Sequence, residues 1–166
     1  MKNVKYKTGF TIAELLIALA ISAMLLVAVA VAFNASAVNY QENEDIFKTI
    51  NNSRQALFRI TSQLRTATAV VHDAPDNECT MITALNENIT YRYNSGDNKL
   101  YLVTNDDLTD SDYVLCDNVT AMTFTKTWVV EDALIKVKSV QISMTVVSGN
   151  VQKTISAAAS IRRNLN

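Results

Sequence analysis

The sequence predicts an α+β fold in which one long N-terminal helix is followed by a C-terminal antiparallel β-sheet head. Three observations predict it. Residues 10–33 are an apolar run in which only Thr11, Glu14 and Ser22 are polar. Apolar residues then recur at helical spacing until about residue 64, and beyond residue 68 the apolar period changes to two. A helix followed by strands is typical of folds in which the helix covers one face of a sheet.

Length and composition exclude several classes of protein. A chain of 166 residues has room for one modest domain and at most one accessory element. Its 15 basic and 16 acidic residues leave no broad cationic surface, which disfavours DNA binding. One His and two Cys do not supply the four ligands of a structural zinc site. His72 beside Asp73 has no accompanying nucleophile elbow or glycine-rich loop, so we expect neither an enzyme nor a cofactor.

The apolar run, residues 10–33, is long enough to cross a membrane. At 1.5 Å per residue it spans roughly 36 Å, against a hydrocarbon core of about 30 Å. Only basic side chains precede it and acidic ones follow it: Lys2, Lys5 and Lys7 on one side, Glu42, Glu44 and Asp45 on the other. The positive-inside rule therefore predicts a single pass through a membrane, with the N-terminus cytoplasmic and the rest outside.

Residues 34–68 are predicted to continue the helix as an amphipathic half. Neither Pro nor Gly interrupts the chain from Phe10 to about Thr68. One apolar stripe is spaced at steps of four, seven, three and four residues: Ile46, Ile50, Leu57, Ile60 and Leu64. We expect this stripe to pack on the protein's own head, because a free coiled coil needs sustained heptads.

Residues 69–166 are predicted to form the antiparallel head. Residues 140–146 and 151–161 alternate on either side of the turn 148–150, which indicates a hairpin. Residues 89–93 and 100–103 indicate a second hairpin, and 122–130 a further strand. The parity of the apolar positions changes between Val137 and Val140, which requires either a bulge near Ser139 or a strand that begins there.

The junction K-Y-K-T-G-F-T-I-A-E-L-L, residues 5–16, is the most specific feature of the chain. It resembles the signal sequence of type IV prepilins and type II secretion pseudopilins. The resemblance implies that residues 1–9 are a leader, which a prepilin peptidase and methyltransferase removes between Gly9 and Phe10 before methylating the Phe10 amine. Residues 10–33 would then anchor the protein in the bacterial inner membrane and later form the filament core. Val31 occupies the place where major pilins commonly carry Pro, so a helix kink there is in doubt.

A looser resemblance points to a minor subunit. Residues 53–60, 64–67 and 160–164 are similar to J-type minor pseudopilins and W-type minor pilins. This implies a subunit that primes or caps a pilus or pseudopilus, with other pilins as its partners. Two alternatives stay open: a membrane-anchored binding module or receptor that does not polymerise, and a membrane-tethered enzyme.

Glu14 is a candidate assembly residue. A carboxylate within an apolar segment costs a few kcal/mol to insert and needs a cation. Cleavage after Gly9 would create an ammonium at Phe10, and the ammonium of a displaced neighbouring subunit would neutralise Glu14 and set the stagger between subunits. The alternative is that Glu14 lies near the helix end and reaches the cytoplasmic headgroups by itself.

Two further groups of residues are candidate sites in the head. Cys79 and Cys116 lie in the part expected outside the cytoplasm, where a disulfide is predicted and two buried free thiols are the alternative. The cluster Asp106, Asp107, Asp110 and Asp112 is a weak candidate for a calcium ion. It lacks the EF-hand pattern and its Gly, which favours a solvated loop.

Overall fold

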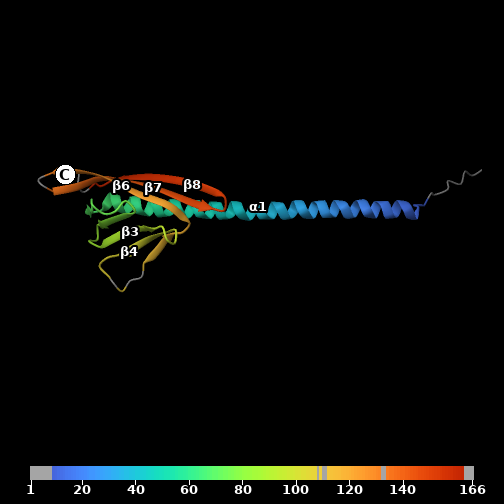
Figure 1. Ribbon diagram of the computed structural model, residues 1–166, viewed down its shortest axis with the longest axis horizontal. Helices are drawn as coiled ribbons and strands as arrows, with labels where there is room; N and C mark the ends of the chain where they lie inside the picture. The colour runs from blue at the N-terminus through green and yellow to red at the C-terminus, as the bar shows by residue number, and fades with distance from the viewer. Residues whose placement is uncertain (1–8, 108, 110–111, 132–133, 163–166) are drawn as a thin grey trace, which may run out of the picture. The chain divides into compact units, whose positions relative to one another are not determined.

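The computed structural model describes residues 9–107, 109, 112–131 and 134–162, and the chain divides into two compact units between residues 41 and 42. Within these residues, one helix and eight strands follow each other: α1 (Ile12–Thr66), β1 (Ala69–Val70), β2 (Glu78–Ile82), β3 (Asn88–Asn94), β4 (Lys99–Thr104), β5 (Tyr113–Cys116), β6 (Val119–Glu131), β7 (Leu134–Ser148) and β8 (Val151–Ser160) (Figure 1). This confirms the predicted α+β fold, a long apolar N-terminal helix with antiparallel strands.

The first unit consists of the N-terminal part of α1. Every helical residue up to position 41 is exposed, and residues 15–41 carry no charged side chain. Within the described residues, α1 is the one helix whose length and composition suffice to cross a membrane. The hydroxyls of Ser22 and Ser36 donate to the carbonyls of Ala18 and Ala32, at 2.8 and 2.9 Å. These bonds satisfy the hydroxyls within the helix, as an apolar surrounding requires. Helix α1 continues without a break through Val31.

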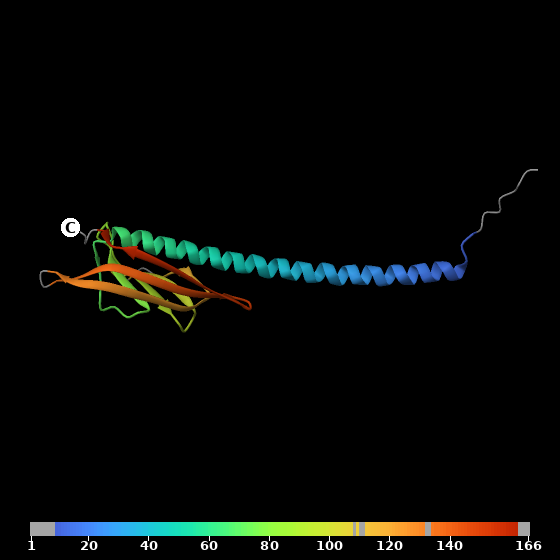
Figure 2. The same cartoon turned by 90° about the horizontal axis from the view of Figure 1, so that it is seen from above.

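The second unit contains two antiparallel sheets, where the sequence indicated one. The five-stranded sheet has the order β1-β2-β3-β4-β5, and the three-stranded sheet the order β6-β7-β8. Figures 1 and 2 show both sheets beside the C-terminal part of α1. Both predicted hairpins are present, as β3–β4 and β7–β8. At the β7–β8 turn Gly149 has φ 56°, a conformation that glycine adopts at no steric cost.

The core of the second unit joins α1 to both sheets. From the predicted stripe Leu57, Ile60 and Leu64 are buried, whereas Ile46 and Ile50 are half-buried. The same core includes residues from both sheets: Met81, Tyr91, Leu100, Phe124, Ile142 and Met144. Each fully buried large apolar side chain contributes about 1.5–3 kcal/mol relative to its exposed state. An amphipathic half-helix packed on its own head therefore agrees with the observed burial.

A bulge explains the change of parity in β7. Thr127 pairs with Ser139, but the next residue of β6, Trp128, pairs with Val137. Lys138 is therefore the additional residue on β7, and the strand continues on both sides of it. Of the two alternatives that the sequence left open, the bulge is the correct one.

The predicted Cys79–Cys116 disulfide is not formed, and both residues are buried free thiols. Cys79 lies on β2 and Cys116 on β5, and strands β3 and β4 lie between them. Three strand spacings amount to about 14 Å. A disulfide needs the two Cα atoms within about 7 Å. The alternative of two buried thiols is the one that the structure has, and Cys116 Sγ lies 3.5 Å from Ser53 Oγ on α1.

Because Cys79 and Tyr91 are buried, we expect the head to become less stable at alkaline pH. Desolvation raises the pKa of Cys79 from 9.0 to about 12 and that of Tyr91 from 10.0 to about 12. Above pH 9 the unfolded chain releases these protons and the folded chain retains them. The free energy of unfolding should therefore stay level below pH 9 and then fall by up to about 1.4 kcal/mol per pH unit for each group.

Denaturant unfolding of the head between pH 7 and 11 measures this effect. The Cys79→Ala variant is the control, because its stability should fall less steeply between pH 9 and 10, where the thiol is the first of the two groups to titrate. A level profile up to pH 11 for the unsubstituted head would contradict the prediction.

Candidate cleavage and assembly site

Thr11 and Glu14 close the start of α1 with a reciprocal set of hydrogen bonds. The backbone N–H and the hydroxyl of Thr11 both donate to Glu14 Oε2, each at 2.9 Å, and the Glu14 N–H donates to Thr11 Oγ1 at 3.3 Å. This is a capping box, with Thr11 as N-cap and Glu14 three residues later. The T-x-x-E pattern before an apolar run is the recognised signature of a capping box, but this pattern was not among the sequence predictions. The capping box fixes the first helical residue at Ile12.

Gly9 and Phe10 precede the helix and are exposed. Phe10 is 89% exposed, and neither residue belongs to a helix or strand. A Cβ atom built on Gly9 would meet no other atom within 4 Å. The described fold therefore gives no steric reason for glycine at this position. Residues 1–8 of the predicted leader lie outside the described residues.

Glu14 has hydrogen-bond partners but, among the residues that the structure describes, no counter-charge. Ion pairs between described residues join Lys48 to Glu44, Arg92 to Asp112, and Glu131 to Lys136 and Lys138, and none of these pairs includes Glu14. Both hydrogen bonds from Thr11 fall on Oε2. The site thus presents one carboxylate, on the fifth residue after the Gly9–Phe10 bond, at the start of an uncharged helical segment.

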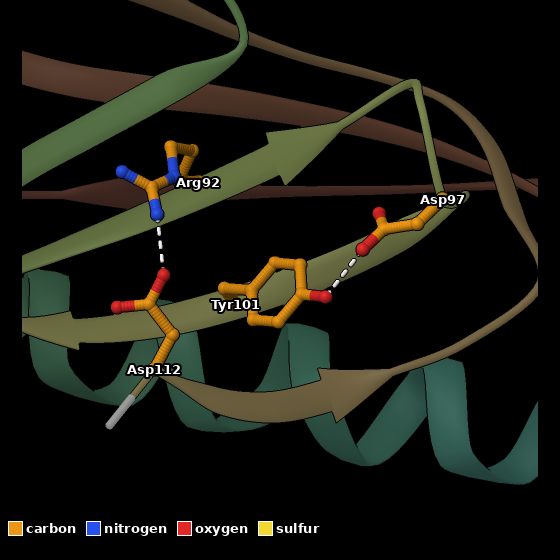
Figure 3. Close-up of polar contacts among 4 residues, drawn as sticks. All are labelled: Arg92, Asp97, Tyr101 and Asp112. Carbon is orange, nitrogen blue, oxygen red and sulfur yellow. Dashed lines mark hydrogen bonds and ion pairs between the residues drawn. The ribbon is translucent and has the colours of Figure 1, made fainter.

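The three described aspartates of the candidate calcium cluster bind separate partners. Asp106 Oδ2 accepts from the Asn88 N–H at 2.7 Å, and Asp107 Oδ1 accepts from the N–H and hydroxyl of Thr109 at 2.9 and 2.6 Å. Asp112 pairs with Arg92, as Figure 3 shows. Asp110 lies outside the described residues. Among the described residues no group of three potential metal ligands is gathered.

The same face of the β3–β4 hairpin carries a second polar contact. The Tyr101 hydroxyl donates to Asp97 Oδ2 (Figure 3), and this bond raises the pKa of Tyr101. Arg92 and Tyr101 are opposite each other in the register of β3 and β4. The arrangement explains how the exposed side of this hairpin is ordered, and it places no nucleophile beside a general base.

His72, the imidazole that the sequence singled out, contacts an aromatic ring. Its ring lies edge-on to the ring of Trp128, with centroids 6.1 Å apart and planes at 63°. Such edge-to-face contacts contribute about 0.5–1.5 kcal/mol beyond the area they bury. His72 therefore has a packing role in the structure.

Comparison with known proteins identifies one match. Residues 4–30 match the family model of the prokaryotic N-terminal methylation motif. The comparisons with curated proteins and with solved structures gave no match. The matched residues include the Gly9–Phe10 bond, the capping box and most of the apolar segment. The motif supports a type IV pilin-like or pseudopilin-like protein, a class of structural subunits, and together with the apolar helix it fits a membrane-anchored pilin.

Proposed function

We propose that this protein is a structural subunit of a type IV pilus or type II secretion pseudopilus, and specifically a minor subunit that primes or caps the filament. The observation that carries the proposal is the match of residues 4–30 to the N-terminal methylation motif, together with the exposure of every apolar side chain of α1 up to Phe33. An exposed apolar helix surface must be covered by lipid or by protein. The membrane would cover it before assembly, and the filament core would cover it afterwards.

Processing at Gly9 is the first step of the proposed function. A prepilin peptidase hydrolyses the Gly9–Phe10 peptide bond, and the new Phe10 amine is then methylated. Two observations favour this bond as the substrate. It lies in exposed chain before the first helical residue, Ile12, and the described fold itself gives no steric reason for glycine at position 9. The requirement for glycine would then come from the pocket of the peptidase.

Assembly through Glu14 is the second step. Cleavage converts the Phe10 nitrogen into an ammonium, while Glu14 lies within the apolar segment and forms no ion pair with another described residue. Glu14 Oε2 accepts both bonds from Thr11, so Oε1 is available to the ammonium of a neighbouring subunit. The pair would neutralise both charges in an apolar bundle and fix the axial stagger. The head, outside the inner membrane, would then form the filament surface.

Blocking the cleavage tests the proposal. We expect Gly9→Leu to abolish processing and leave a full-length chain in the membrane, because the bulky side chain would have to fit where the enzyme accepts glycine. Ser22→Ala is the matched control, since it changes a residue inside the same motif and far from the bond, and it should be processed normally. Immunoblots of cells with an active prepilin peptidase distinguish the two lengths. Equal processing of Gly9→Leu and the unsubstituted chain would contradict the assignment.

A further inference from the structure

The two cysteines of the head are buried at separate places in the five-stranded sheet. Cys79 on β2 is opposite Tyr91 on β3, and Cys116 on β5 is opposite Leu100 on β4. Tyr91 and Leu100 are both fully buried, so the strands between the cysteines carry core side chains. The two thiols therefore cannot meet unless β3 and β4 leave the space between β2 and β5.

A disulfide between Cys79 and Cys116 is incompatible with this strand order. Three strand spacings place their Cα atoms about 14 Å apart, whereas a disulfide needs them within about 7 Å. The difference of about 7 Å exceeds one strand spacing, so a change of side-chain rotamer does not close it. A chain that carries this bond has to arrange β2 to β5 in a different way.

The folded head protects both thiols from oxidation. Cys79 is 0% and Cys116 is 3% exposed, and α1 lies against Cys116, whose Sγ is 3.5 Å from Ser53 Oγ. Burial raises the pKa of both thiols, which lowers the fraction of thiolate, the form that attacks a disulfide. Oxidation of the folded chain therefore requires that the head opens first.

The unfolded chain has neither protection. Its thiols are exposed to solvent, and the 37 positions from Cys79 to Cys116 keep them at an effective concentration on the order of millimolar. With glutathione disulfide as oxidant, one cysteine thiolate attacks the oxidant and releases a glutathione thiolate. The other cysteine thiolate then attacks the mixed disulfide and releases the second one. Two electrons pass to the oxidant, and the released thiolates take up the two protons that the cysteines lose.

We propose that Cys79 and Cys116 make folding of the head sensitive to redox conditions: the reduced chain folds as described, and a chain oxidised before folding is excluded from this fold until the bond is reduced. The order of the two events decides the outcome, because folding first buries the thiols and oxidation first fixes a wrong arrangement of strands. The inference concerns the fold and goes beyond the proposed function. With the head outside the cytoplasm, as proposed, folding and thiol oxidation compete in every newly exported chain.

Refolding of the full-length chain in detergent tests the inference. The reduced chain is unfolded in guanidinium chloride, and one half is oxidised with glutathione disulfide to the intramolecular bond, which intact mass verifies. After removal of the denaturant, the reduced half should regain the near-ultraviolet circular dichroism of the untreated protein, and the oxidised half at most about a tenth of it. Dithiothreitol should then restore the signal. A bridged chain that regains the full signal, or a signal that dithiothreitol does not restore, would overturn the inference.

Two controls separate the bond from other effects of the oxidant. The double variant Cys79→Ala/Cys116→Ala forms no bridge, so its signal after refolding should be the same with and without oxidant. An equal loss of signal in this variant would contradict the inference. In the second control the folded chain receives the same oxidant, and thiol titration after an acid quench should show bridge formation at least about 100-fold slower than in the unfolded chain.

Equal rates of bridge formation in the folded and unfolded chains, with the circular dichroism of the folded chain unchanged, would also overturn the inference. None of these results depends on cleavage between Gly9 and Phe10. The proposed function therefore stands or fails separately.

Discussion

Replacing Glu14 with leucine should leave membrane insertion and cleavage intact and abolish assembly. Leucine inserts into a bilayer more readily than glutamate does. The methylated Phe10 ammonium of the neighbouring subunit would then lie in an apolar bundle without a counter-charge, at a cost of several kcal/mol. Several kcal/mol correspond to a loss of at least about 100-fold in the association constant. The effect should appear only where subunits pack together.

The Glu14→Gln variant separates the two roles of this side chain. Leucine also removes the capping box, which is worth about 1 kcal/mol at a helix start. Glutamine retains a carbonyl oxygen that accepts from the Thr11 N–H, so it preserves the cap and removes only the charge. We expect both variants to fail in a filament or secretion assay and in crosslinking between subunits, in a strain where each replaces the native protein. Normal assembly of both would mean that Glu14 sets no register, and would favour a monomeric anchored receptor.

Replacing Phe124 with alanine should destabilise the head by about 3–5 kcal/mol, the usual cost of truncating a fully buried phenylalanine. Its ring is completely buried at the centre of β6, in the core shared with α1 and β7. A typical domain has only about 5–15 kcal/mol of stability in total. This single change should therefore remove a large part of it.

Phe58→Ala is the matched control for Phe124→Ala. Phe58 is the same residue type on α1 and is 75% exposed, so its loss should change the free energy of unfolding by less than about 0.5 kcal/mol. Denaturant unfolding of a fragment that begins near residue 34 provides the measurement, and we expect this fragment to be soluble and monomeric. Equal stability losses in the two variants would mean that the core is not arranged as described.

Strong local periodicity made the helix and both hairpins predictable from the sequence. Short strands were missed because they carry too few alternations: β5 has four residues, and β2 has inward apolar side chains only at Cys79 and Met81. Because these strands were not predicted, the division of the head into two sheets was not predicted either. The disulfide prediction failed for a related reason. The expected location of the head outside the cytoplasm favoured a disulfide, but the separation of the two cysteines depends on strand order, which no local pattern encodes.

The candidate site was predictable because its residues are neighbours in the sequence. Gly9, Phe10 and Glu14 are within six positions of one another, so no tertiary contact has to be inferred to find them. Lys126 shows the opposite case. It occupies an inward position of β6 and donates to the carbonyls of Ala74 and Pro75 at 2.7 and 3.1 Å. A buried lysine that donates to carbonyls 51 and 52 residues away in the sequence leaves no signal in the local pattern.

The most direct test of the proposed function is the N-terminus of the protein recovered from a sheared filament or envelope fraction. The chain should begin with N-methylated Phe10 and lack the three lysines of residues 1–9, so that its charged side chains sum to 12 basic against 16 acidic, or −4. N-terminal sequencing and intact mass measure both properties in one sample. Recovery of only the full-length chain, beginning at Met1, from a host with an active prepilin peptidase would contradict the assignment as a filament subunit.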